Sequence, residues 1–479
     1  MRELRKRRQR NEMLKKAAIY GTAAVVAIVA IIGISAIVKK SGSTNTGGSA
    51  VGTGTEIEQE NETQKAQRLE EERKTLLTDA DRLAASYDYD GAIAMLQSFE
   101  GYEEYADMTE KISEYEATKA SCVPVNIDEV THIFYHSLVV DPERCFGNQA
   151  NDRQCVGNNQ WMTTISEFNK ITQEMYDRGY VMISIHDLYN ITTDENGNEV
   201  FEPATIMLPE GKKAFVLSLD DLSYYHSYDN YGYAAKLIID ENGDVVNEYI
   251  DAEGNTLIGG YDVVPLMDKF IEEHPDASYK GAKGIIALTG YNGILGYRTD
   301  ISYTQLDSDL DHDKRKWIED HPEFDLEKER AEAKKVVEAM KANGWEFASH
   351  TWGHLSVGNL SLERLQADTK RWRENVEPLV GPTNTIIFAH GQDLGTWGNY
   401  DESNAKVQFL KEQGYSVFCN VDANQYRTWF GKDYMRQGRR NLDGYRIYYN
   451  AIGTQNNVSD LFDAKEILDP DRPPVQPLT

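Results

Sequence analysis

Residues 213–221 read Lys-Ala-Phe-Val-Leu-Ser-Leu-Asp-Asp, an apolar run that ends in two consecutive carboxylates. A short, almost continuous apolar run of this kind predicts a buried β-strand. Two carboxylates at the end of a buried strand are costly unless they meet a cation or a network of hydrogen-bond donors. The stretch therefore predicts a core strand that delivers Asp220 and Asp221 to a charged site.

A second motif supplies the other half of that site. Residues 350–354 read His-Thr-Trp-Gly-His. Two histidines four residues apart lie on one side of a helical turn, so both imidazoles can reach one metal ion. The Asp220-Asp221 pair is placed to supply a third ligand. Two histidines and one carboxylate leave a coordination position open for water, which is typical of a catalytic zinc site.

The rest of the chain from Val123 onward alternates between strand and helix patterns. This alternation favours an α/β domain with a parallel sheet, and a barrel with its site at the carboxyl ends of the strands satisfies the pattern. The predicted strands are 131–138, 180–185, 213–219, 283–289, 345–349, 384–389, 415–421 and 445–449. The predicted helices are 164–178, 262–273, 327–343, 361–379 and 403–413. Turn signals at Asn196-Gly197, Asn242-Gly243 and Glu253-Gly254 predict β-hairpins, including an insertion over residues 224–260.

These motifs resemble those of the polysaccharide deacetylases of carbohydrate esterase family 4, which have the NodB-type fold. The resemblance extends over roughly residues 130–450 and implies a distorted (β/α) barrel. It implies that Asp220 is the general base and that Asp221, His350 and His354 are the metal ligands. Zinc is the default metal for such a ligand set, and other divalent ions remain open.

Two features depart from the family pattern. The family places an arginine beside the base in a third motif, but here residues 388–392 read Phe-Ala-His-Gly-Gln. The family also ends its last strand with a histidine that acts as general acid, and no histidine follows His390. We therefore predict His390 as the replacement acid, with a histidine at the edge of the core as the alternative.

Other residues have two open interpretations each. Three arginines lie near Asp443 in the sequence, namely Arg436, Arg439 and Arg440. They can pair with Asp220 in place of the missing arginine, or they can form a surface ion-pair network. For His136 and His226 a structural role is the favoured interpretation. The aromatic candidates for stacking on sugars are Trp352, Trp397 and Trp429, and core packing is the favoured interpretation for each of them.

The amino-terminal segment has a charge opposite to that of the rest. The formal net charge is −28, and residues 1–40 carry ten Lys/Arg and two Glu. The remainder is therefore strongly acidic, which argues against binding of nucleic acid or of an anionic lipid surface. Residues 17–38 are an uncharged apolar run preceded by basic residues. Such a run predicts a transmembrane helix with its amino terminus in the cytoplasm; a cleaved signal peptide is the alternative.

The predicted domain organisation follows from these segments. A cytoplasmic basic tail (1–16) and the transmembrane helix (17–38) precede a flexible linker (39–56). A helical segment (57–122) has the periodicity of a tetratricopeptide-like hairpin, and acts either as a spacer or docking cap for the next domain or as a peptide-binding repeat. The deacetylase-like domain spans 123–465, and an irregular tail spans 466–479.

The resulting hypothesis is a single-pass cell-membrane protein with an extracellular metal-dependent deacetylase domain. The family resemblance implies an N-acetylated polysaccharide as substrate, and cell-wall peptidoglycan is the first candidate. A degenerate module that binds glycan or metal without turnover is the main alternative. A hydrolase of a non-sugar amide or ester is a third. The sequence leaves the oligomeric state open.

Overall fold

The computed structural model describes residues 62–306, 312–422 and 427–478. The chain divides into two compact units, Met1–Gln67 and Arg68–Thr479, and only the first turns of helix α2 (Glu62–Ala85) are described in the first unit. The predicted transmembrane helix over residues 17–38 lies outside the described residues. Within the described ranges, no helix combines the length and apolarity that crossing a membrane requires.

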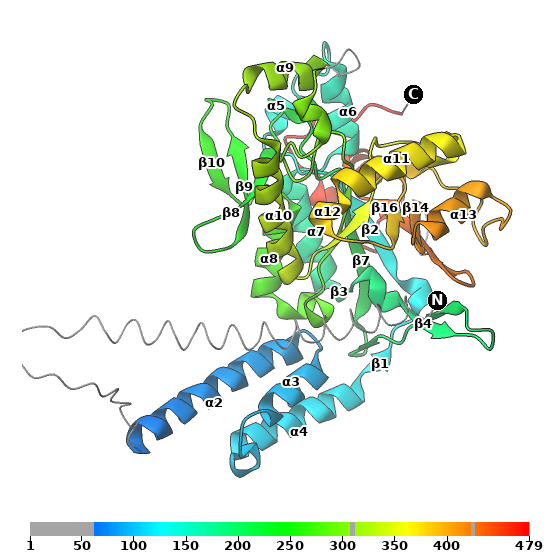
Figure 1. Ribbon diagram of the computed structural model, residues 1–479. Coiled ribbons are helices and arrows are strands. Elements are labelled where there is room, and N and C mark those ends of the chain that lie inside the picture. The colour runs from blue at the N-terminus through cyan, green and yellow to red at the C-terminus, as the bar shows by residue number, and fades with distance from the viewer. Residues whose placement is uncertain (1–61, 307–311, 423–426, 479) are drawn as a thin grey trace, which may run out of the picture. The chain divides into compact units, whose positions relative to one another are not determined.

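A closed parallel barrel forms the centre of the second unit (Figure 1). Each strand pairs with the next in parallel, and β7 pairs with β11 to close the ring. In ring order the seven described strands are β11 (Ile285–Leu288), β12 (Glu346–Ser349), β13 (Thr385–Ile387), β14 (Val417–Val421), β16 (Met435–Asn441), β2 (Thr131–Tyr135) and β7 (Lys213–Asp220). The predicted (β/α) barrel is confirmed.

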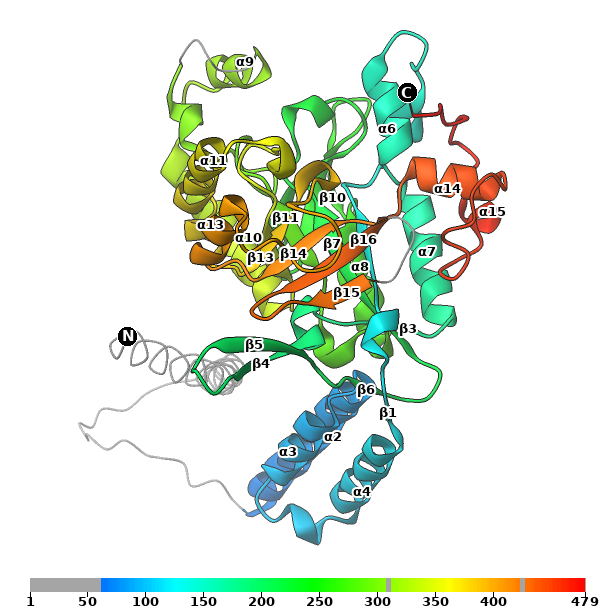
Figure 2. The same ribbon diagram turned by 90° about the vertical axis from the view of Figure 1, so that its right-hand side faces the viewer.

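Two more strands extend the barrel sheet. β3 (Tyr180–Met182) pairs in parallel with β7, and β15 (Arg427–Phe430) pairs antiparallel with β16. Figure 2 shows β14, β15 and β16 side by side on one wall. The predicted strand over 180–185 is thus shorter and lies outside the ring of seven.

The predicted strand over 445–449 is wrong, because this segment is helix α14 (Gly444–Ala451). Its aromatic and β-branched residues favour a strand. However, Asp443 accepts a hydrogen bond from the backbone N–H of Arg446 and caps a helix. The last barrel strand is β16 instead, which contains three arginines and therefore lacks an apolar strand pattern.

Helices surround the barrel (Figures 1 and 2). Their apolar residues pack against it. The main core joins the barrel to these helices through residues such as Phe168, Val263, Val336 and Trp345. The predicted helix over 361–379 is two helices that meet at Val376. The helices described here are α5 (Pro142–Phe146), α6 (Arg153–Trp161), α7 (Ile165–Asp177), α8 (Val263–Glu273), α9 (His312–Asp320), α10 (Leu326–Ala342), α11 (Leu362–Asn375), α12 (Glu377–Val380), α13 (Ala405–Glu412) and α15 (Ala464–Ile467).

Small antiparallel sheets confirm the predicted hairpins. β4 (Tyr189–Thr193) pairs with β5 (Glu199–Pro203), and the insertion after β7 forms a three-stranded sheet. The strands of that sheet are β8 (Ala234–Ile239), β9 (Val245–Ile250) and β10 (Thr256–Gly259), and the remaining pair is β1 (Val123–Pro124) with β6 (Met207–Leu208).

The helical segment before the barrel contains α2, α3 (Tyr89–Gln97) and α4 (Ala106–Ser121). Residues between α2 and α3 contact the barrel domain. The Tyr87 hydroxyl donates a 2.8 Å hydrogen bond to the backbone oxygen of Asp276, and the Tyr87 ring stacks on Tyr279. These contacts agree with a docking cap.

Candidate active site

The first part of the site lies where β7 ends. Asp220 is the last residue of β7 and Asp221 follows it with a φ of 61°. This left-handed conformation is uncommon for a residue with a side chain and turns the chain sharply out of the strand. Both carboxylates are buried, at 3% and 5% relative exposure. They consequently need compensating partners, as the sequence predicts.

The two histidines lie on the loop after β12 rather than on a helical turn. Thr351 and His354 both have positive φ, at 64° and 52°, so the backbone between the histidines is not helical. Asp368 of α11 holds this loop by accepting 2.8 Å hydrogen bonds from the backbone N–H groups of Trp352 and Gly353. The predicted helical turn is wrong, but the loop still brings His350 and His354 together.

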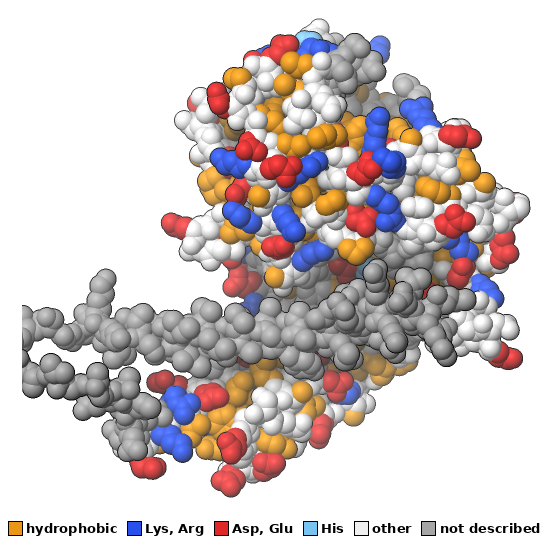
Figure 3. All heavy atoms as spheres, viewed as in Figure 1, with side chains coloured by type: hydrophobic (Ala, Val, Ile, Leu, Met, Phe, Trp, Pro, Cys, Tyr) orange, Lys and Arg blue, Asp and Glu red, His pale blue; other side chains and the backbone are white. Residues whose placement is uncertain are grey.

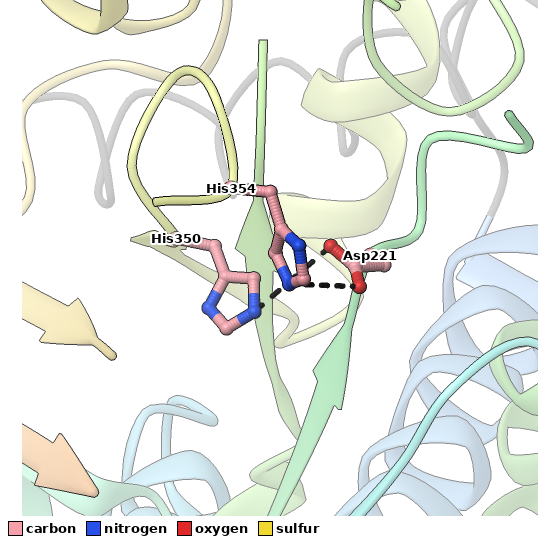
Figure 4. Close-up of side chains that lie close together, drawn as sticks. All are labelled: Asp221, His350 and His354. Atoms are coloured by element: carbon pink, nitrogen blue, oxygen red, sulfur yellow. Dashed lines mark ion pairs between the residues drawn. The ribbon is translucent and has the colours of Figure 1, made fainter. Parts of the chain in front are cut away.

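Asp221, His350 and His354 converge on one point, as Figure 4 shows. One ligand atom from each lies within 4.8 Å of the others. His354 Nε2 is 3.4 Å from Asp221 Oδ2, and His350 Nε2 is 3.9 Å from Asp221 Oδ1. Two imidazole nitrogens and a carboxylate oxygen match the ligand types of a three-residue zinc site.

The contacts around these three residues suit metal ligation. His350 Nδ1 lies 2.8 Å from the backbone oxygen of Ile387, to which it donates, and this leaves its Nε2 as an acceptor facing the site. The Tyr225 hydroxyl lies 2.6 Å from Asp221 Oδ1 and orients that carboxylate. Burial lowers the pKa of His354 to about 4, against the opposing attraction of Asp221. His354 is therefore neutral at physiological pH, as a ligand must be.

Asp220 points to a different partner. Both terminal nitrogens of Arg439, on β16, donate to its two oxygens at 2.7 and 2.9 Å. Burial by itself raises the pKa of Asp220, but the charges of Arg439 and His350 outweigh it and hold that pKa well below its usual range. Of the three arginine candidates, Arg439 is therefore the one that pairs with Asp220. The two other candidates pair elsewhere, Arg436 with Asp393 and Arg440 with Asp460.

A buried layer of neutral side chains supports Arg439 inside the barrel. Ser218 Oγ lies 3.1 Å from Arg439 Nη1 and 2.9 Å from His132 Nε2. The other ring nitrogen of His132 lies 3.0 Å from Gln437 Oε1. Burial lowers the pKa of His132 well below its ordinary value, so the ring is neutral and Ser218 donates to it. The layer fixes the guanidinium without adding a competing charge.

His390 lies beside the candidate metal ligands. It follows β13 with a φ of 58°, is exposed, and its ring centroid is 4.3 Å from that of His354. Its Nε2 is 3.1 Å from the backbone oxygen of His354 and donates to it. The residue predicted as the acid therefore lies at the site. Its Nε2 is engaged by this hydrogen bond, and its other ring nitrogen is Nδ1.

His136, for which the sequence favoured a structural role, also lies near the site. His136 directly follows β2, and its electrostatic influence reaches Asp220, His354 and Asp443. The signal available in the sequence was its position near the carboxyl end of the strand predicted over 131–138. His226, in contrast, hydrogen-bonds to Tyr303 and packs on Trp317, which agrees with a structural role.

Among the three tryptophans, Trp352 lies within the loop that carries His350 and His354, called the metal loop below. Its Nε1 donates to Asp300 at 2.8 Å, and the Arg371 guanidinium lies 4.6 Å from its ring centroid. The Trp397 ring packs under Arg427 and Arg436, and Trp429 is partly exposed.

Comparisons with known proteins agree with the motif analysis. Residues 314–409 match the model of the polysaccharide deacetylase family, a range that contains His350, His354 and His390. This match confirms the resemblance. A deacetylase of Streptococcus pyogenes, PplD, solved in complex with acetate, is 15% identical with a TM-score of 0.33 over 66% of this chain and 93% of its own. Among curated proteins, none shows significant similarity to this chain.

Proposed function

We propose that this protein is a membrane-anchored, extracellular, metal-dependent deacetylase that removes acetyl groups from an N-acetylated polysaccharide, with peptidoglycan N-acetylglucosamine as the first candidate substrate. The observation that carries the proposal is the Asp221, His350 and His354 triad directly beside the Asp220–Arg439 pair. The polysaccharide deacetylase match supports the hydrolase class. The apolar run over residues 17–38 is the basis for the membrane anchor.

The residues of the chain divide the work of amide hydrolysis. Asp221, His350 and His354 would hold a divalent ion, most simply zinc, which supplies an activated water and positive charge for the acetyl oxygen. Asp220 accepts a proton from the attacking water. Arg439 keeps Asp220 ionised and aligned for that transfer. Water oxygen bonds to the acetyl carbon, the carbon–nitrogen bond breaks, and acetate and a free amine are released.

The departing amine needs a proton, and we assign its delivery to His390. An imidazole near this site can transfer a proton at neutral pH. His136 is the second candidate, because it directly follows β2 and, besides the proposed ligand His350, its charge acts on both Asp220 and His354.

Asp220→Asn is expected to retain the metal and to lower acetate release about 10²- to 10⁴-fold, the usual contribution of a positioned proton acceptor. The amide keeps the shape of the side chain but cannot take the proton. The measurement is acetate released from chitohexaose and from peptidoglycan, with and without added zinc, together with metal content. Asp460→Asn is the matched control, because its carboxylate pairs with Arg440 away from the site. Full activity in Asp220→Asn would remove it as base, and metal loss would make it a ligand.

His390→Gln is expected to lower turnover about 10²- to 10⁴-fold with unchanged metal content. The same measurement on His136→Gln separates the two candidates, since only the acid should show the larger loss in turnover number. Wild-type activity in His390→Gln with a large loss in His136→Gln would transfer the role to His136. Absence of acetate release by the unmodified protein from every acetylated glycan would instead favour the binding-module alternative.

A further inference from the structure

A groove of about 860 Å³ borders the metal loop. Its volume lies within the range of sites that bind small molecules. It is lined by Trp352, Gly353 and Leu355, which flank His354 in the sequence, and by residues of α11. A ligand in this groove would lie beside the proposed reaction centre.

A row of aromatic rings joins the groove to the metal ligands. The Tyr225 hydroxyl contacts Asp221, and the Tyr225 ring stacks on Tyr291 with 5.1 Å between centroids. Tyr291 in turn meets the Trp352 ring edge to face at 6.4 Å. Tyr291 and Trp352 both line the groove. The groove is therefore connected to the reaction centre by contacting rings, although Asp221, His350 and His354 do not themselves line it.

The acidic side chains of the groove already have partners. Asp368 accepts from two backbone N–H groups of the metal loop. Asp300 accepts from Trp352 Nε1 and from the backbone N–H of Ser302. Glu374 pairs with Lys370 at 2.5 Å. These acids consequently hold the protein together and have little capacity left for a ligand.

Two arginines in the groove differ from these acidic side chains in their hydrogen bonds and ion pairs. Arg364 and Arg371 are exposed on α11, and neither side chain donates a hydrogen bond or forms an ion pair with any described residue. Seven residues apart, they lie on the same helix face, separated by roughly 10 Å along the axis. The Arg371 guanidinium is held over the Trp352 ring, so its orientation is partly fixed. Figure 3 shows basic side chains among the acidic ones on the face that carries α10 and α11.

We propose that this groove is a subsite for a glycan that carries an anionic substituent, a carboxylate or a phosphate, which Arg371 and Arg364 bind. The inference rests on the proposed function. A guanidinium presents a planar pair of donors that matches both anions, which explains why Arg serves at such sites. Because the whole chain has a net charge of −28, general attraction for polyanions is absent and recognition depends on these local cations. The subsite would select glycans with an anion near the N-acetyl group to be cleaved.

The test compares the affinities of three probes by calorimetry on the full-length chain carrying Asp220→Asn, which prevents turnover. Chitohexaose is the neutral probe, a hyaluronan hexasaccharide is the carboxylate probe, and chitohexaose 6-phosphate is the phosphate probe. At least one anionic probe is expected to bind 10-fold or more tightly than chitohexaose in low salt. Arg364→Gln/Arg371→Gln should remove that preference and change the affinity for chitohexaose less than twofold. Whichever anionic probe binds more tightly identifies the substituent.

Arg82→Gln/Arg153→Gln is the matched control, since it removes two exposed arginines outside the groove. It should retain the preference, and melting temperatures should agree among all variants. Equal affinity of the parent chain for all three probes would overturn the subsite, as would a preference that survives Arg364→Gln/Arg371→Gln. Acetate release is measured separately on the chain with Asp220 intact. If that chain releases no acetate while the Asp220→Asn chain still prefers an anionic probe, the deacetylase proposal is rejected and the subsite is retained.

Discussion

His350→Ala/His354→Ala is expected to abolish stoichiometric binding of a divalent ion. A four-ligand protein zinc site is worth roughly 10–16 kcal/mol, or about 3 kcal/mol for each ligand. Loss of two of the three protein ligands should therefore weaken binding about 10⁴-fold or more. Metal analysis of the purified full-length chain after equilibration with zinc measures this directly, and acetate release should disappear with the metal.

His312→Ala/His321→Ala is the matched control, because it also removes two imidazoles, both of which are exposed and neither of which belongs to the cluster around Asp221. It should bind one zinc per chain like the parent protein. Unchanged zinc content in His350→Ala/His354→Ala would disprove the assigned site. Metal loss in the control as well would show that the ion is held by surface histidines.

The sequence predicted most of the barrel because most of its strands are apolar. The predicted strands around Ile133, Leu217, Ile286, Phe347, Ile386 and Phe418 all belong to the ring. The polar strand β16 was missed, because part of the barrel interior is not filled with apolar side chains. His132, Ser218, Gln437 and Arg439 hydrogen-bond to one another there. A buried strand of this kind has no hydrophobic pattern for a sequence analysis to find.

The site residues were predictable to different degrees for a similar reason. The ligands Asp221, His350 and His354 occur in short motifs whose spacing carries the chemistry. The partner of Asp220 lies 219 residues away on another strand, and only the pairing of β14, β16 and β2 brings it there. Three neighbouring arginines were equivalent in the sequence, and side-chain direction alone distinguished Arg439 from Arg436 and Arg440.

Arg439→Met is expected to destabilise the fold by about 3–5 kcal/mol, the usual cost of leaving one partner of a buried ion pair alone. Arg439 is fully buried and its partner Asp220 is 3% exposed, so water cannot replace the lost donors. Ser218 would lose a partner in the same step. The free energy of unfolding, measured by denaturant titration of the full-length chain, gives the effect. Acetate release should fall as well, because Asp220 loses the group that aligns it.

Arg440→Met is the matched control on the adjacent residue of the same strand. Its partner Asp460 has a side chain that is 37% exposed and can be hydrated, so a smaller loss than in Arg439→Met is expected. Asp220→Asn/Arg439→Met provides the second comparison. Removing both charges should cost less than the sum of the single changes by about 1 kcal/mol or more, because neither partner is then left ionised and unpaired. If the single effects simply add, the Asp220–Arg439 pair is not coupled, and the prediction that Arg439 replaces the third-motif arginine fails.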